Sequence, residues 1–273
     1  MSSLEHNLPY KITSPKSKKV AMLLSIPHSG IRFPKNIKGK YNSSMIEHPD
    51  DTDWYLQELY DFASEMGVTV IEAVYSRWVI DLNRTPENQN LYDDGRIITA
   101  LCPNTDFFGT YIYSHSENEP SKFEVIRRLK EYYIPYHEKI DQILIELYKE
   151  FGQALLWDAH SIRRNVRTIQ ESDFPDLILG NNDGTTASNR IIETALKSLQ
   201  SSNFDIEHNQ PFKGGHITRS KGNPSKGIHA LQLEMSKDLY MKNNEQDYDP
   251  KKAIKIKTTL KHTFSQLISC LHE

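Results

Sequence analysis

The sequence predicts an α/β fold in which helices cover both faces of a mixed, largely parallel sheet. Short apolar runs that end in polar residues alternate along the chain with longer amphipathic segments, which is the pattern of strands alternating with helices. One such run, residues 154–157, stops abruptly at Asp158-Ala159-His160-Ser161. A buried parallel strand has this form when it delivers polar groups to the carboxyl edge of a sheet, where ligands of open α/β folds bind. His160 is therefore either a metal ligand with Asp158 as its supporting acid, or a structural histidine at a strand end.

The first part of the chain predicts two strands and one helix. The expected elements are an extended lead-in over 1–18, a buried strand over 19–26, a helix over 54–66 and a strand over 68–74. The first strand ends at Pro27-His28-Ser29-Gly30, a second strand-to-loop junction that carries a histidine. Asp51 and Asp53 precede the helix, where they can cap it by accepting hydrogen bonds from its free N–H groups, or can serve as metal ligands.

Residues 75–84 form an unusual stretch, in which Arg77 and Arg84 bracket a short apolar core. If this stretch is a strand, side-chain alternation puts Arg77 and Asp81 on the same face. The following residues, 85–120, are rich in Pro, Asn, Asp and Gly and predict a long functional or covering loop.

The second half of the chain predicts a further alternation of helices and strands. The expected elements are a helix over 121–150 that bends or restarts at Pro135, strands over 154–157 and 174–179, a helix over 186–200, a turn and strand over 212–219, a strand over 226–236 and a closing helix over 251–272. The 212–219 segment carries Lys213, His216 and Arg219, and the last strand brings Glu234 to its end.

The composition fits a single domain over residues 1–273, with 37% hydrophobic residues, 25% charged residues and a net charge of −3. A near-neutral chain without a basic block gives no reason to expect a nucleic acid or an anionic membrane as partner. The expected partner is a small-molecule substrate, because ligands of open α/β folds bind at the sheet edge that the polar strand ends reach. The start of the chain shows no signal-peptide pattern, and no window holds the roughly 20 apolar residues of a membrane helix. A cytoplasmic protein is therefore expected. The oligomeric state is not predicted.

The two cysteines, Cys102 and Cys270, lie far apart, which argues against a disulfide scaffold and against a cysteine-based zinc site. Any metal must then be held by histidine and carboxylate. Two histidines and one carboxylate, with a separate glutamate as general base, would form a zinc hydrolase centre. Mn, Co or Fe(II) would suit such ligands nearly as well as zinc. Strand ends supply His28, His160 and Glu234 for this purpose.

Arg77 and Arg84 fit the same chemistry. A tetrahedral intermediate needs a cation near its oxyanion, and a substrate carboxylate needs a bidentate partner. Surface salt bridges are the alternative role for both arginines.

A series of stretches resembles, in order, the motifs of the N-formylglutamate amidohydrolase family. They cover about residues 20–242 and are Pro27-His28-Ser29-Gly30, Asp51-Thr52-Asp53-Trp54, Ser76-Arg77 with Asp81-Leu82-Asn83-Arg84, Pro135-Tyr136-His137, Asp158-Ala159-His160-Ser161, Phe212-Lys213-Gly214-Gly215-His216-Ile217-Thr218-Arg219 and Gln232-Leu233-Glu234. The Asp81–Arg84 run is also similar to aspartoacylase and, more distantly, to zinc carboxypeptidases.

The resemblance implies a fold like the zinc carboxypeptidases (phosphorylase/hydrolase-like) and an amide hydrolase with one zinc per chain. The roles that it implies are His28 and His160 as metal ligands, Glu234 as general base, Arg77 as the carbonyl-polarising residue, and Asn83 with Arg84 as the clamp on a substrate carboxylate. Those distant relatives have a glutamate three residues after the first histidine, where this chain has Ile31. The carboxylate ligand is therefore expected to be Asp53, with Asp51 as second choice. Lys213, His216 and Arg219 are assigned to the glutamate carboxylates.

The expected function is hydrolysis of N-formyl-L-glutamate to L-glutamate and formate, the last step of one histidine degradation route. The alternatives are a related zinc amidohydrolase acting on another N-acyl amino acid or a peptide fragment, a non-catalytic metal-dependent binding protein, and a domain whose polar strand ends are purely structural.

Overall fold

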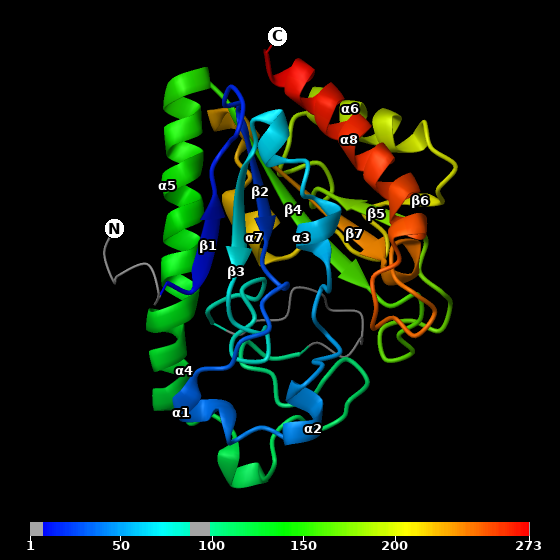
Figure 1. The fold of residues 1–273 in the computed structure, drawn as a ribbon. Helices are drawn as coiled ribbons and strands as arrows, with labels where there is room; N and C mark the ends of the chain where they lie inside the picture. Colours follow the sequence, from blue (N-terminus) through cyan, green and yellow to red (C-terminus); the bar gives the residue numbers. More distant parts are fainter. Residues whose placement is uncertain (1–7, 88–98, 273) are drawn as a thin grey trace.

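The structure is a computed structural model that describes residues 8–87 and 99–272, and its centre is a seven-stranded sheet (Figure 1). In the order β1-β3-β2-β4-β7-β5-β6 the strands are β1 (Tyr10–Thr13), β3 (Thr69–Ala73), β2 (Met22–Ile26), β4 (Ala154–Ile162), β7 (Ile228–Ser236), β5 (Leu177–Gly180) and β6 (Ile206–His208). The four central strands β3, β2, β4 and β7 run parallel, whereas β1 is antiparallel to β3 and β5 is antiparallel to β7. The prediction of a mixed, largely parallel sheet is confirmed.

Helices cover both faces of this sheet, as predicted. They are α1 (Lys35–Lys38), α2 (Ser43–Ile46), α3 (Leu56–Leu59), α4 (Lys122–Arg128), α5 (Ile134–Phe151), α6 (Asn189–Gln200), α7 (His216–Lys221) and α8 (Pro250–His272), with a π-helical turn (Leu129–Tyr133) between α4 and α5. One hydrophobic core joins the sheet to α3, α6 and α8, and a second joins its other face to α5. Figure 1 shows α5 on one side of the strands and α6 with α8 on the other. Within the described residues, no helix is long and apolar enough to cross a bilayer.

Strand β4 shows how the sheet sorts apolar and polar side chains. Leu155 and Trp157 belong to the core with α8, whereas Leu156 belongs to the core with α5. Because side chains alternate, Asp158 and His160 follow Leu156 on the α5 face, at the carboxyl end of the strand. The parallel register pairs His160 with Glu234 of β7, so both reach the same edge.

Two predictions for the first part of the chain are wrong. Residues 10–13 are not extended lead-in but the edge strand β1, in which Tyr10 and Ile12 pack against the α5-side core. The helix expected over 54–66 is reduced to α3 (Leu56–Leu59) and a 3₁₀ turn (Ser64–Met66).

The preceding aspartates do not cap α3. Its N-cap is Tyr55, in the left-handed region with φ 61°, and no side chain caps it. The backbone N–H of Asp53 instead donates to the His28 carbonyl (3.0 Å), which turns the loop towards the end of β2.

Two other segments also differ from expectation. Residues 75–84 form turns and no strand, so Arg77 and Asp81 approach one another across a turn. The 212–219 segment is a turn that leads into α7, because Asn83 caps that helix from far away in the sequence: its Oδ1 accepts from the Ile217 N–H (2.8 Å).

The remaining segments are closer to prediction. The described parts of the expected 85–120 loop, 85–87 and 99–120, are irregular apart from isolated bridges and one 3₁₀ turn (Ser116–Asn118), while 88–98 lie outside the described residues. Pro135 lies in the first turn of α5, as predicted for a helix that restarts there. The short strand β6 was not predicted.

The backbone around Gly30, two residues after His28, is tightly packed at the carboxyl edge of the sheet, and substitution of Gly30 tests this packing. A Cβ at Gly30 would lie 2.3 Å from the Tyr75 carbonyl oxygen, whereas a Cβ at Gly39 would have nothing within 4 Å. We expect Gly30→Ala to destabilise the fold by about 1–3 kcal/mol through overpacking, seen as a melting temperature several degrees lower. Gly39→Ala is the matched control and should melt within a degree or two of wild type; equal melting of both variants would contradict the packing described here.

Candidate metal centre

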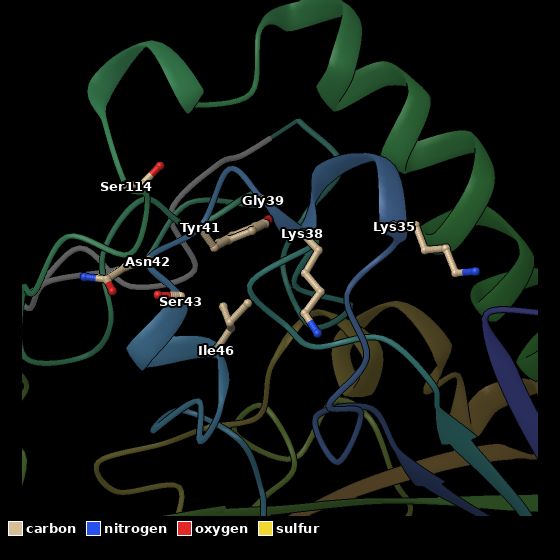
Figure 2. Close-up of a pocket in the computed structure, with 8 residues that line it drawn as sticks. All are labelled: Lys35, Lys38, Gly39, Tyr41, Asn42, Ser43, Ile46 and Ser114. Atoms are coloured by element: carbon tan, nitrogen blue, oxygen red, sulfur yellow. The ribbon is translucent and has the colours of Figure 1, made fainter.

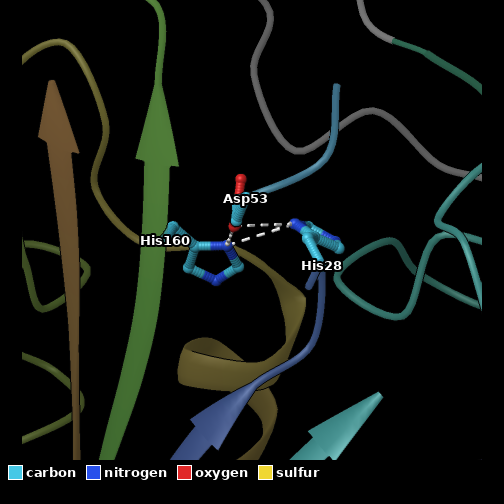
Figure 3. Close-up of side chains that lie close together, drawn as sticks. All are labelled: His28, Asp53 and His160. Atoms are coloured by element: carbon cyan, nitrogen blue, oxygen red, sulfur yellow. Dashed lines mark hydrogen bonds and ion pairs between the residues drawn. The ribbon is translucent and has the colours of Figure 1, made fainter. Parts of the chain in front are cut away.

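Three buried side chains, His28, Asp53 and His160, meet at the carboxyl edge of the sheet (Figure 3). His28 follows β2, His160 lies near the end of β4, and Asp53 lies in the loop before α3. The two imidazole Nδ1 atoms are 3.1 Å apart, and they lie 3.7 Å (His28) and 3.3 Å (His160) from Asp53 Oδ2. The structure thus brings together the three predicted ligands.

The geometry of this cluster fits a divalent metal ion. Tetrahedral bonds of about 2.0–2.1 Å separate ligand atoms by about 3.3–3.4 Å, and the three observed separations, 3.1, 3.3 and 3.7 Å, lie around that value. In addition, Asp53 Oδ2 is buried and accepts no hydrogen bond from the described residues. Such an oxygen is unfavourable unless something positive binds it.

Each histidine is held from behind by a buried carboxylate. His28 Nε2 lies 2.8 Å from Asp81 Oδ1, and His160 Nε2 lies 3.0 Å from Asp158 Oδ2. The Asn83 amide nitrogen also lies 3.1 Å from His160 Nε2. The two carboxylates accept from the Nε2 atoms and so orient both rings with Nδ1 towards the centre, the arrangement in which outer carboxylates support ligating histidines. Asp158 as supporting acid was predicted, whereas the partnership of Asp81 with His28 was not.

Asp51, the alternative carboxylate ligand, has a different place. Its Oδ2 accepts from the Trp78 indole N–H (2.9 Å) and its Oδ1 from the Phe107 N–H (3.1 Å). Burial raises the pKa of Asp51 to about 6. Its carboxylate therefore ties the 99–120 loop to Trp78, and Asp53 is the carboxylate in the cluster.

The two histidines have opposite electrostatic environments. Burial and the nearby Arg77 charge lower the pKa of His28 to about 4. Burial acts in the same direction on His160, but the Asp158 and Asp53 carboxylates outweigh it and hold its pKa well above the usual value. Burial would raise the pKa of Asp53, yet the imidazoles of His160 and His28 hold it below its usual value. Because a histidine ligates a metal through an unprotonated nitrogen, binding here requires both Nδ1 atoms to be free of protons.

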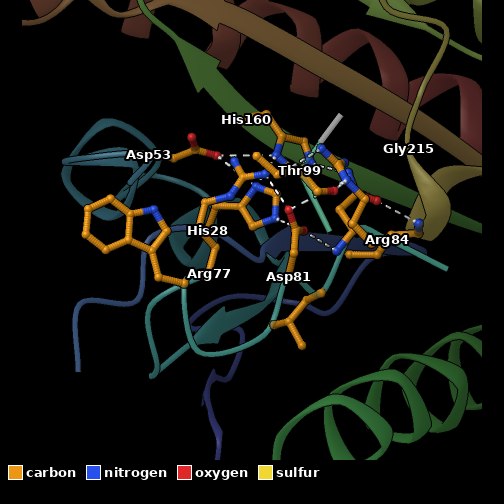
Figure 4. Close-up of polar contacts among 12 residues, drawn as sticks. His28, Asp53, Arg77, Asp81, Arg84, Thr99, His160 and Gly215 are labelled. Carbon is orange, nitrogen blue, oxygen red and sulfur yellow. Dashed lines mark hydrogen bonds and ion pairs between the residues drawn. The ribbon is translucent and has the colours of Figure 1, made fainter. Parts of the chain in front are cut away.

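Arg77 and Arg84 lie on the side of the centre formed by Asp81 (Figure 4). Arg77 is buried, donates to Asp81 Oδ2 (2.5 Å), and places its guanidinium 4.7 Å from the centroid of the Phe107 ring. Arg84 donates to the carbonyl and hydroxyl oxygens of Thr99 and lies 4.0 Å from Asp81 Oδ2. Neither arginine forms an ordinary surface salt bridge, because its partner Asp81 is fully buried.

Glu234 stands beside His160 on the neighbouring strand β7, where its side chain is mostly buried but keeps some exposure to solvent. Burial raises its pKa to about 8; the neighbouring His160 lowers it and Asp53 raises it further. A carboxyl group with a pKa near neutrality is suited to accept and return a proton.

The other predicted substrate residues differ in their surroundings. Asn83 is buried: its amide nitrogen contacts His160 and Gln232, and its oxygen caps α7. The His216 ring, at the start of α7, lies 5.6 Å from that of His137.

The two remaining cations lie on either side of the turn before α7. Lys213 pairs with the exposed Asp183 (2.7 Å), and Arg219 donates to the Gly214 carbonyl (2.7 Å). A separate surface pocket near α1 and α2 contains none of the residues of the centre (Figure 2); it is lined by Lys35, Lys38, Gly39, Tyr41, Asn42, Ser43, Ile46 and Ser114.

The fold and the site together define an α/β protein with a buried His–Asp–His cluster that could hold a metal ion, a carboxylate beside it and two arginines behind it. A model of the N-formylglutamate amidohydrolase family matches residues 20–241. N-formylglutamate deformylase of Pseudomonas aeruginosa is 39% identical to the chain over 236 residues, 85% of this chain and 86% of that protein. The Pseudomonas putida N-formylglutamate deformylase is 37% identical over 237 residues, 86% and 87% of the two chains. The chain belongs to the N-formylglutamate amidohydrolase family.

A solved structure agrees on the fold. The crystal structure of N-formylglutamate amidohydrolase from Ralstonia eutropha JMP134 matches with a TM-score of 0.79 at 22% identity, over 96% of this chain and 97% of that one.

Substitution of the two aspartates separates the roles assigned to them. We expect Asp53→Asn to lower the affinity for zinc by more than about 100-fold, since loss of a direct ligand costs more than loss of an outer partner. Asp51→Asn should keep wild-type affinity, because Asp51 contacts Trp78 and Phe107 instead. Metal content after dialysis against a weak chelator measures both variants. Loss of metal in Asp51→Asn with retention in Asp53→Asn would reverse the assignment.

The raised pKa of Glu234 predicts a pH-dependent stability of the metal-free protein. The carboxyl titrates near 4.5 when unfolded and at about 8 when folded. Between these values the unfolded state releases the proton first, so stability from this group is full below about pH 4.5 and is lost as the pH rises through about 8. The neutral, non-titrating Glu234→Gln variant should therefore gain melting temperature relative to wild type at about pH 9 but not at about pH 4. A constant difference at both pH values would contradict the shift.

Proposed function

We propose that the protein hydrolyses the formamide bond of N-formyl-L-glutamate, giving L-glutamate and formate, in a reaction that requires a divalent metal ion. The observation that carries the proposal is the cluster of His28, Asp53 and His160 beside Glu234, in a chain of this family. The two relatives at 39% and 37% identity bear the name of this deformylase. We also propose that the reaction is the last step of a histidine degradation route.

The ligand set favours zinc, one ion per chain, because zinc binds two imidazoles and one carboxylate and leaves a fourth position open. Mn, Co and Fe(II) tolerate the same ligands. A bound ion would supply Lewis acidity, which polarises the formyl carbonyl and makes a water molecule more acidic.

Glu234 moves the proton. It takes a proton from the attacking water as the oxygen bonds to the formyl carbon, and it gives that proton to the amide nitrogen as the C–N bond breaks. The products are formate and the free amine of glutamate. The partly exposed position of Glu234, next to His160, supports this role.

The positively charged arginines are proposed to bind the negatively charged groups of the substrate and of the transition state. Arg77, anchored by Asp81, is proposed to lie against the oxygen that becomes negative during attack, where a fixed cation stabilises the transition state more than the substrate. Arg84 and Asn83 are proposed to clamp a substrate carboxylate. Lys213, His216 and Arg219 are proposed to contact the carboxylates of the glutamate moiety.

The test of function is formate release from N-formyl-L-glutamate, before and after chelation and after restoring zinc. We expect activity that is lost on chelation and recovered with zinc. Bound metal without formate release would indicate that the substrate is another N-acyl amino acid or a peptide fragment. If no such amide is hydrolysed, the protein would be a metal-dependent binding protein.

The role of Glu234 has its own test. Glu234→Gln should keep its metal content and lower kcat by about 10²–10⁴-fold, the usual contribution of general acid–base catalysis. A Glu234→Gln variant with near-normal kcat would overturn the assignment.

A further inference from the structure

The segment 77–84 carries Asp81, the outer partner of His28, yet it belongs to no strand. Asp81 Oδ1 lies 2.8 Å from His28 Nε2 and also accepts from the Asn83 backbone N–H (2.9 Å). No strand ladder fixes the backbone of this segment, so the positions of Asp81 and Asn83 depend on other hydrogen bonds.

Three donors from the α4–α5 helix supply such bonds. Arg128 Nη1 donates to the Val79 carbonyl (2.9 Å). His137 Nε2 lies 2.9 Å from the Leu82 carbonyl oxygen, and the Tyr133 hydroxyl donates to the Arg84 carbonyl (2.8 Å). The bonds from Tyr133 and His137 bracket Asn83 and follow directly on Asp81.

The π-helical turn aligns these donors. Five residues separate Arg128 from Tyr133, an interval that an α-helix would rotate by roughly 140°. The π turn at Leu129–Tyr133 is wider, so both side chains reach the same side of the helix. His137 then follows Tyr133 by four residues, one turn of α-helix.

The two aromatic donors are rigid. Tyr133 and His137 are buried, and their rings stack at 4.1 Å with an interplanar angle of 25°. Since the Leu82 carbonyl can only accept, the His137 ring must carry its proton on Nε2. Neither ring is used in the proposed chemistry, although Pro135-Tyr136-His137 stood out in the sequence.

We propose that Tyr133 and His137 are positioning residues of the metal centre, which hold the Arg84 and Leu82 carbonyls and thereby set where Asp81, together with the Asn83 N–H bonded to it, supports His28. This inference rests on metal binding at the centre, as proposed above, but not on the identity of the substrate.

Tyr133→Phe tests the inference with Tyr132→Phe as the matched control. Tyr132 lies in the same π turn and is buried, but its hydroxyl contacts Arg127 near the surface and not the 77–84 segment. We expect Tyr133→Phe to bind zinc about 10-fold more weakly in competition with a chromophoric chelator, the lower end of the effect of outer partners. Its cobalt-substituted form should have a changed visible spectrum, whereas Tyr132→Phe should match wild type in both measurements.

His137 gives a second, independent comparison. His137→Phe removes the donor and keeps an aromatic ring against Tyr133, while His137→Gln keeps an N–H that can reach the Leu82 carbonyl. We expect weaker zinc binding in His137→Phe and partial recovery in His137→Gln. If the His137 variants do not fold, the tyrosine pair decides.

Equal zinc affinity and equal cobalt spectra in Tyr133→Phe and Tyr132→Phe would overturn the inference. Wild-type protein that binds no zinc would overturn the metal centre itself, before any variant is compared. Wild-type protein that binds zinc without releasing formate would overturn only the proposed substrate and leave this comparison valid.

Discussion

The site depends on one buried carboxylate, Asp81. Its Oδ1 contacts His28 Nε2 (2.8 Å) and accepts from the Asn83 N–H (2.9 Å), while Oδ2 accepts from Arg77 (2.5 Å). Burial would raise the pKa of this carboxyl, but Arg77 and His28 outweigh it and hold the pKa well below its usual range. A buried anion is stable only with such partners. The same anion therefore fixes a metal ligand and an arginine relative to one another.

The parallel sheet supplies the other half of the arrangement. Because β2, β4 and β7 run in the same direction, their carboxyl ends meet at one edge, where His28, His160 and Glu234 arrive together. Only Asp53 comes from a separate loop, and its N–H is bonded to the His28 carbonyl. Strand geometry places two of the ligands, and one backbone hydrogen bond brings in the third.

The residues that the sequence predicts well are those whose position follows from local pattern. His28 and His160 end apolar runs, and a buried parallel strand carries such an end to the sheet edge. The strand considered for 75–84 does not form, and three carbonyls of this segment bond instead to Arg128, His137 and Tyr133, which lie about 50 residues away in sequence.

The prediction of a strand in 212–219, where the structure has α7, was wrong for a related reason. The side chain that caps it, Asn83, is 134 residues before Ile217, and no periodicity reveals such a partner. The sequence alone could not decide whether Asp53 or Asp51 is the carboxylate of the cluster, because the two differ only in tertiary contacts, those of Asp51 with Trp78 and Phe107.

The neighbouring positions of Asp51 and Asp53 connect two parts of the molecule. Asp51 holds the Phe107 N–H, Phe107 lies against Arg77, and Asp53 faces the two histidines two residues further along the same loop. Any coupling between the conformation of the 99–120 loop and occupancy of the centre has this short route to act through, and such coupling is reciprocal. If a bound ion makes Phe107 more ordered, then a molecule that orders Phe107 strengthens binding of the ion by the same free energy.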